Sequence, residues 1–251
     1  MAKAETAVAV KEEAGALGDV IDFGADSGGG FEEADSSSYA IPFLRILQSL
    51  SPQCKKSDPA YIKGAEEGDF FNTVSEKLYK GEDGLIVVPC HYVRKFNAWA
   101  PRESGGGLRG SYTPLEASKL VTTQNERFQN IMEDDSILTD TRDHYVLIVN
   151  ADGSYEPVLL PLSATQMKKS KKWMTMMQGI RINGQVAPMF SQMYKLTPVA
   201  ESNDKGSWSG IKIEHNGQVK SRELYEAAKS FREMVRSGEA KASTDTEEVP
   251  F

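Results

Sequence analysis

The sequence predicts a mainly β fold with helices (α+β), and three observations indicate that class. Runs of β-branched and aromatic residues recur along the centre of the chain, as is typical of strands. An Asp-Gly pair joins two of these runs, which indicates a β-hairpin. Two other segments repeat apolar residues every three or four positions, as amphipathic helices do. With 251 residues, 39% of them hydrophobic, the chain can bury one sizeable core.

Charge divides the chain into a mildly basic centre and two acidic ends. The net charge is −7; residues 1–40 carry −7 and residues 238–251 carry −3, which leaves +3 between them. Both ends are enriched in small polar and acidic residues, which bury too little apolar area to offset the entropy of ordering the chain. We therefore expect a disordered acidic N-terminal arm at 1–40, a folded domain at 41–237 and a disordered acidic C-terminal tail at 238–251.

The first half of the folded domain predicts mostly strands. Residues 41–50 hold the first dense apolar patch, which could form a short helix or a strand. Residues 68–74 and 85–99 are rich in β-branched and aromatic types and predict two strands. Pro89 interrupts the second strand, and because proline cannot donate to a β-ladder it predicts a bulge or a sheet edge.

A polar region separates these strands from the clearest local signal in the chain. Three consecutive glycines make residues 101–112 a predicted mobile loop, and residues 114–132 look partly helical. Residues 144–150 and 155–162 are two apolar runs joined by a four-residue turn that contains the Asp-Gly pair. This arrangement predicts a β-hairpin.

The second half predicts a helix, two strands and a final helix. Residues 164–178 should form a helix that Ser163 caps and a glycine ends. Strands are expected at 188–199 and 207–216, and a C-terminal helix at 221–236. This order of elements is that of an OB-like five-stranded barrel with a helix between strands 3 and 4, to which an extra hairpin and the C-terminal helix are added.

The sequence contains no pattern that recommends an enzyme, a cofactor or a metal site. The three histidines are too scattered to form a ligand pair, and the acidic run 133–135 looks like a solvated loop more than a magnesium site of a nuclease. No phosphate-binding glycine loop or nucleophile motif occurs. The two cysteines form no CxxC pair, and the chain lacks both a secretory signal and the ~20-residue apolar run of a membrane span. We expect an intracellular, non-enzymatic protein.

Aromatic and basic residues alternate in two stretches, YVRKFNAWAPR at 92–102 and KKSKKW at 168–173. Single-stranded nucleic acid requires this mixture, because cations meet its phosphates and flat rings stack on its unpaired bases. Two alternatives stay open: the rings of the first stretch could fill the barrel core, and the lysines of the second could simply solvate a helix. The predicted nucleic-acid-binding residues are Tyr92, Arg94, Lys95, Phe96, Trp99, Arg102, Arg109, Tyr112, Lys168, Lys169, Lys171, Lys172 and Trp173.

The chain ends in TDTEEVPF, where acids precede a short apolar tip with a terminal phenylalanine. This ending resembles the C-terminal tip of bacterial and bacteriophage single-stranded-DNA-binding proteins. The resemblance implies a phage protein of the bacterial cytoplasm, with an OB-type fold, that binds and protects single-stranded DNA in a sequence-tolerant way during replication, recombination or repair. It also implies that replication or recombination proteins bind the tip residues Glu247, Glu248, Val249, Pro250 and Phe251.

The departures from the bacterial form are the long acidic N-terminal arm, the extra hairpin, the glycine loop and the C-terminal helix at 221–236. They leave open which residues bind and how many subunits assemble, a homo-oligomer included. One alternative function is a phage adaptor or inhibitor of a host nucleic-acid enzyme, which would act through acidic ends that imitate DNA. A metal-dependent nuclease is the third hypothesis.

Overall fold

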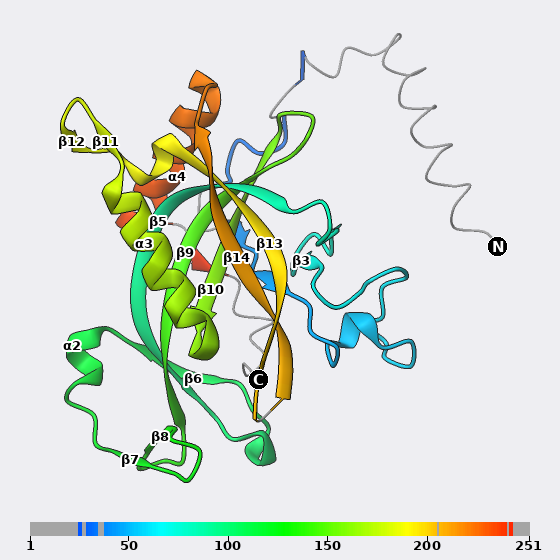
Figure 1. The fold of residues 1–251 in the computed structure, drawn as a ribbon, viewed down its shortest axis with the longest axis vertical. Coiled ribbons are helices and arrows are strands. Elements are labelled where there is room, and N and C mark those ends of the chain that lie inside the picture. The colour runs from blue at the N-terminus through cyan, green and yellow to red at the C-terminus, as the bar shows by residue number, and fades with distance from the viewer. Residues whose placement is uncertain (1–24, 27–28, 35–37, 205, 240, 243–251) are drawn as a thin grey trace. The chain divides into compact units, whose positions relative to one another are not determined.

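A computed structural model of the chain describes residues 25–26, 29–34, 38–204, 206–239 and 241–242 (Figure 1). The chain divides into two compact units, Met1–Ser38 and Tyr39–Phe251. Most of the expected N-terminal arm and the whole C-terminal tip therefore lie outside the described residues. The elements below all belong to the second unit.

An eight-stranded antiparallel sheet forms the centre of this unit. Figure 1 shows that the sheet is strongly curled, so the fold is mainly β and barrel-like. Five long strands are hydrogen-bonded side by side in the order β10-β9-β5-β13-β14. The strands are β5 (Leu85–Trp99), β6 (Leu108–Tyr112), β7 (Thr122–Gln124), β8 (Asn130–Met132), β9 (Ile137–Val149), β10 (Tyr155–Ser163), β13 (Gln192–Asn203) and β14 (Gly206–Gln218).

Three small sheets accompany the large one. An antiparallel sheet of β2, β3 and β4 packs beside it, β11 and β12 form a short hairpin, and β1 pairs with β15 in parallel. The last pairing brings the two ends of the described unit together. The strands are β1 (Ala40–Ile41), β2 (Leu44–Ile46), β3 (Phe70–Asn72), β4 (Leu78–Tyr79), β11 (Arg181–Ile182), β12 (Gln185–Val186) and β15 (Lys241–Ala242).

Two long helices pack on the curled sheet. Helix α4 begins where the Ser221 hydroxyl accepts the amide hydrogen of Leu224, and it ends at Gly238, whose left-handed φ of 77° favours glycine. The helices are α2 (Pro114–Ala117), α3 (Met167–Gly179) and α4 (Arg222–Ser237). Single 3₁₀ turns lie at Pro52–Cys54, Arg102–Ser104, Ala164–Gln166 and Met189–Ser191.

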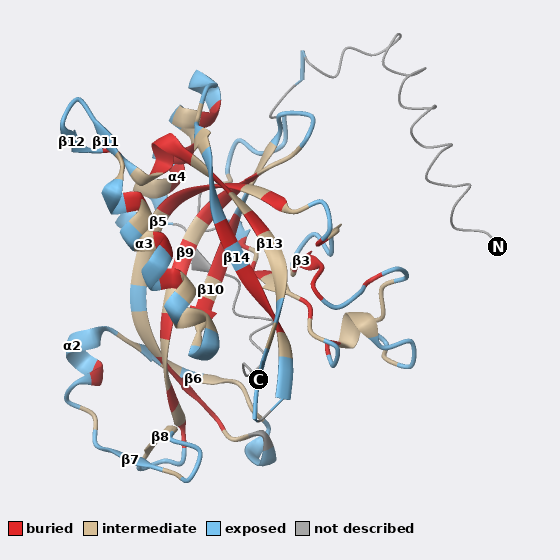
Figure 2. Ribbon diagram, in the orientation of Figure 1, coloured by how far each residue is buried: buried red, intermediate tan, exposed pale blue. Residues whose placement is uncertain are grey.

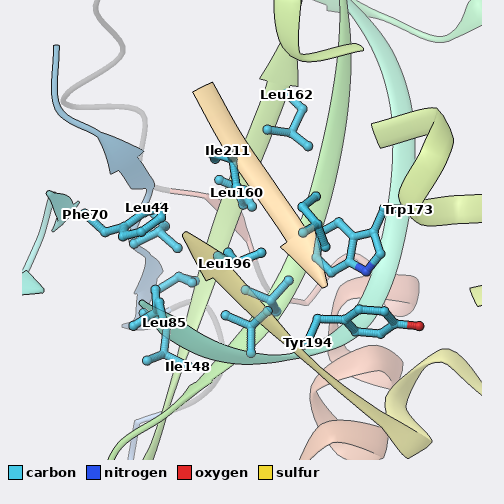
Figure 3. Packing of buried hydrophobic residues seen from close by; sticks show 14 of the residues in the cluster. Leu44, Phe70, Leu85, Ile148, Leu160, Leu162, Trp173, Tyr194, Leu196 and Ile211 are labelled. Atoms are coloured by element: carbon cyan, nitrogen blue, oxygen red, sulfur yellow. The ribbon is translucent and has the colours of Figure 1, made fainter. Parts of the chain in front are cut away.

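Side chains that alternate along β5, β9 and β10 supply two separate cores, which appear as buried stretches of these strands in Figure 2. One core lies inside the curl and includes residues of α3 and β13 (Figure 3); its largest members include Phe70, Leu160, Trp173, Tyr194 and Leu196. The other core lies between the opposite face and α4, and includes Val88, Leu147, Leu159, Leu224 and Phe231.

Several predicted elements are confirmed. Strand β5 has the predicted limits, and its register with β9 shifts between Pro89 and His91, which is the expected bulge. The hairpin is β9–β10, the two later strands are β13 and β14, and the C-terminal helix is α4. Residues 41–50 contribute short strands and not a helix.

Two local predictions were wrong, and the partly helical character of residues 114–132 is confirmed only for a short helix. The glycine segment 101–112 is not only a loop, because its second half pairs with β5 as strand β6. Residues 114–132 contain one short helix, and the remainder supplies the hairpin of β7 and β8. Ser163 precedes a 3₁₀ turn but its side chain makes no capping hydrogen bond. The strand in the glycine segment depends on pairing with β5, which local sequence does not reveal.

Candidate nucleic-acid interface

Strand β5 divides the predicted binding residues between two faces of the sheet. Beyond the bulge, Tyr92, Arg94 and Phe96 alternate with Val93, Lys95 and Asn97, and successive side chains of a strand point to opposite faces. The register places Arg94 opposite Arg142 of β9, and Phe96 opposite both Asp140 of β9 and Tyr112 of β6. We call the resulting set the aromatic–basic face: Tyr92, Arg94, Phe96, Tyr112, Asp140 and Arg142.

One carboxylate holds both arginines of the aromatic–basic face. Arg94 donates to Asp140 through Nη2 at 2.8 Å and Nε at 3.2 Å, and its guanidinium lies 5.0 Å from the centre of the Phe96 ring. Arg142 donates to Asp140 at 3.1 Å and to the Tyr92 hydroxyl at 2.8 Å. Two arginines and one aspartate leave a net positive charge, and paired guanidiniums are held in fixed positions. Arg94 is exposed, while Tyr92 and Phe96 are half-buried.

Helix α3 covers the part of the same face that continues toward the core. His144 follows Arg142 on this face; its ring stacks on Trp173 with centroids 4.6 Å apart, and its Nε2 lies 2.8 Å from the Ser170 hydroxyl. The Tyr92 ring also lies beside His144, with ring centroids 5.2 Å apart. A continuous line of rings therefore connects α3 to the aromatic–basic face.

The exposed side of α3 carries Lys168, Lys171 and Lys172, here called the α3 lysines. Among the residues that the structure describes, no carboxylate pairs with any of the three. Lys169, by contrast, is bound to Glu201 of β13 at 2.5 Å. The α3 lysines are thus available to phosphate, and Lys169 is engaged within the fold.

Two of the predicted stacking rings belong to the interior instead. The Trp173 side chain is fully buried and Trp99 is 5% exposed, so neither ring offers a face to a base in this structure. Trp173 shares the buried side of α3 with Ser170 and Met177, at helical spacings of three and four. The open alternative of a core role therefore holds for Trp99, and Trp173 is a core residue as well.

Lys95 and Arg109 are bonded to carboxylates outside the aromatic–basic face. Lys95 is on the opposite face, with Nζ 2.9 Å from the Asp143 carboxylate. Arg109 of β6 is exposed and bonded to the backbone and side chain of Asp134. Arg102 belongs to the 3₁₀ turn that follows β5. The five residues of the tip, 247–251, are outside the described part of the chain.

Sequence reasoning missed Asp140 and Arg142, which organise the face. The predicted first strand of the hairpin started at residue 144, whereas β9 already begins at Ile137. Alternation of Leu138, Asp140, Arg142 and His144 on one side was the available signal. That signal becomes visible only once the strand is known to extend seven residues upstream of the predicted start.

Comparison with models of protein families assigns the chain to one of them. A family model described as "Pam3 phage gp34-like protein" matches residues 11–241, which is most of the sequence. The chain belongs to this family. The family's description names a phage protein, in agreement with the expected bacteriophage character. Searches of curated proteins and of solved structures gave no match.

Two further findings concern this gp34-like chain. No helix within the described ranges is both long and apolar enough to cross a membrane. Over the same ranges, no three side chains of His, Cys, Asp or Glu lie close enough together to hold a metal ion.

The buried His144 should make the stability of the folded chain depend on pH. Burial, with the positive charge of Arg142 as a smaller cause, lowers the pKa of His144 from 6.5 to about 3. An unfolded chain takes up a proton on this imidazole below pH 6.5, and the folded chain does not, so stability is lost as pH falls through that range. As pH falls below 6.5, we expect His144 to lower the free energy of unfolding by roughly 1 kcal/mol per pH unit.

Urea unfolding at pH 7.5, 6.5, 5.5 and 5.0 measures the effect. The His144→Gln variant removes the titrating group and is the control, whatever its absolute stability. Its free energy of unfolding should change less between pH 6.5 and pH 5 than that of the parent. Equal changes in the two proteins would show that His144 is not the group responsible.

Proposed function

We propose that this phage protein binds single-stranded DNA in a sequence-tolerant way and protects it during replication or recombination. The observation that carries the proposal is the aromatic–basic face beside the unpaired α3 lysines. Half-buried rings supply stacking surfaces for bases, at about 1 to 3 kcal/mol per base. The exposed α3 lysines lie on the helix that covers part of the same face, and they supply contacts for phosphates. No chemistry beyond stacking and charge is required, so the proposed protein is not an enzyme.

We also propose that the scaffold is an OB-like barrel. The ladder β10-β9-β5-β13-β14, with α3 between β10 and β13 along the chain, supports an order in which β5 is the first barrel strand. Four successive antiparallel pairings make β10 and β14 run in the same direction. On this assignment the hairpin β9–β10 supplies barrel strands 2 and 3, where the sequence had suggested an addition.

This assignment gives the aromatic–basic face a suitable position. OB folds bind oligonucleotides with the face of strands 2 and 3 and with the loops between strands 1 and 2 and between strands 4 and 5. The connection between β5 and β9 is the long segment 100–136, and Phe96, Tyr112 and Asp140 lie at its base. The proposed DNA path runs from these residues toward the α3 lysines.

Recruitment of replication or recombination proteins is the second part of the proposal. It relies on the sequence of the tip at 247–251, where a free carboxylate and an aromatic ring follow acidic residues. A ring with a terminal carboxylate is a compact anchor for a basic-rimmed apolar pocket.

Replacement of Phe96 by leucine tests the binding surface. The change keeps an apolar side chain but removes the ring, so we expect dT-oligomer binding to weaken by about 1 to 3 kcal/mol if a base stacks there. Phe31→Leu is the control, because this ring is exposed in the first, acidic unit and should have no role in binding. Fluorescence titration measures affinity, and circular dichroism shows that each variant is folded.

Unchanged affinity of folded Phe96→Leu would contradict the proposed surface. If the parent itself binds no oligonucleotide at low salt, the alternative of an adaptor that acts through its acidic ends is favoured.

A further inference from the structure

Strand β7 is the last strand at one end of the eight-stranded sheet, and no described strand pairs with its outer edge (Figure 1). On the inner side, the Met132 amide of β8 donates to the carbonyl of Ser136, the residue before β9, at 2.8 Å. In an antiparallel pair, the backbone groups of two opposite residues either face each other or both point away. Thr122 lies opposite Met132, and Gln124 is two positions further along β7, so the N–H and C=O groups of both point outward.

Two other edges of the sheet are blocked, whereas that of β7 is open. On β10, Pro157 and Pro161 have no N–H to offer, and the Leu159 amide already donates to a carbonyl of the segment before β2. On β14, the Gln48 side chain bonds both the N–H and the C=O of Ser209. Strand β7 has the sequence TTQ, without proline or charge, and all three of its residues are exposed. Open edges of this kind bind further strands.

The most exposed large apolar side chains within the described ranges lie close to β7 in the sequence, on α2, directly before β7 and in the turn after it. They are Leu115 (68% exposed), Val121 (67%) and Phe128 (80%). The Phe128 backbone has a left-handed φ of 60°, which is uncommon for an aromatic residue. The Asn125 side chain fixes this turn, because it accepts from the amides of Arg127 at 3.0 Å and Gln129 at 2.9 Å. A ring displayed in this way indicates a contact surface.

We propose that two copies of this chain associate through β7, with the two strands antiparallel about a twofold axis. Thr123 then lies opposite Thr123 of the second copy, and Thr122 of each copy exchanges its outward hydrogen bonds with Gln124 of the other. The facing threonines make a favourable cross-strand pair, and β7 brings no like charges together. Because a twofold contact uses the same surface on both copies, one interface closes both open edges. The contact is small, so the dimer should be weak and depend on concentration.

Sedimentation velocity of the full-length chain, without nucleic acid and over a series of protein concentrations, measures the association. We expect the average mass to rise with concentration from that of one chain toward that of two. A parent that stays monomeric up to its solubility limit would overturn the proposal. Since no DNA is present, the result does not depend on the proposed function, which the DNA titrations test separately.

Two charge variants at the centre of the interface test the register. Thr123→Lys and Thr123→Glu each place like charges opposite each other in the dimer, so each variant alone should associate at least about tenfold more weakly than the parent. An equal mixture of the two should regain association, because the facing charges then attract. Parent-like association of either variant alone, or a mixture that does not regain association, would refute this pairing.

Ser207→Lys is the matched control, since Ser207 is an exposed strand residue of β14 and gains the same charge. It should associate like the parent, and an equal weakening would mean that only net charge matters. Amide hydrogen exchange of the parent needs no variant and gives a second readout. The outward amides of Thr122 and Gln124 should exchange more slowly as the dimer forms. Unchanged exchange at both amides while the chain associates would exclude β7 as the interface.

Discussion

Replacement of Trp173 by alanine should lower the free energy of unfolding by about 3 to 5 kcal/mol, the usual cost of removing a large buried aromatic side chain. Trp173 is fully buried in the core inside the curled sheet (Figure 3). It stacks on His144 at 4.6 Å and meets Tyr194 edge-on at 5.5 Å. The substitution therefore removes both the buried area and the contact that fixes α3 on β9. Urea unfolding followed by circular dichroism measures the change.

Trp208→Ala is the matched control for this experiment. The Trp208 side chain is only half-buried, and its indole donates to Glu201 at 3.1 Å. Its removal should cost clearly less stability than removal of Trp173. The assignment of Trp173 to the core would be refuted if Trp173→Ala unfolded like the parent while losing affinity for dT oligomers.

Substitution of the three α3 lysines by glutamine should have the second large effect, on DNA binding. Each phosphate contact to a single strand contributes about −0.7 to the slope of log affinity against log salt concentration. If Lys168, Lys171 and Lys172 each meet a phosphate, their joint loss should make the slope shallower by about 2. Affinity at low salt should fall in parallel, while stability changes little because the three side chains are exposed.

A second triple variant, with Lys55, Lys56 and Lys63 changed to glutamine, controls for net charge. These lysines are also exposed and their loss removes the same three charges, but they lie on the segment around the first 3₁₀ turn, away from α3. Its salt slope should stay close to that of the parent. Equal effects of both triple variants would mean that only the total charge matters and that α3 has no specific role.

Local rules predicted the parts of the fold that local interactions determine. Pro89 predicted the bulge of β5, because proline lacks the donor that a regular ladder needs. The C-terminal helix was predicted at 221–236, and α4 ends at Gly238, which adopts the left-handed conformation there. Strand β6 was missed, since its glycine-rich segment becomes a strand only by pairing with β5 across a connection that the sequence does not specify.

The candidate site was predicted in part, for the same physical reason. The alternating aromatic and basic residues at 92–102 do include Tyr92, Arg94 and Phe96 on one side of β5. The sequence could not show that Asp140 and Arg142 lie opposite them, because the register of β9 is a tertiary property. The burial of Trp173 was accessible from its helical spacing to Met177, but the neighbouring lysines favoured a surface role.

Binding of single-stranded DNA by the aromatic–basic face and the α3 lysines is the central claim. Fluorescence titration of the full-length chain with dT oligomers of increasing length, at two salt concentrations, tests it most directly. We expect affinity to increase with length up to a defined site size and to weaken at the higher salt concentration. Absence of binding at low salt, or an affinity that is the same at both salt concentrations, would contradict the claim.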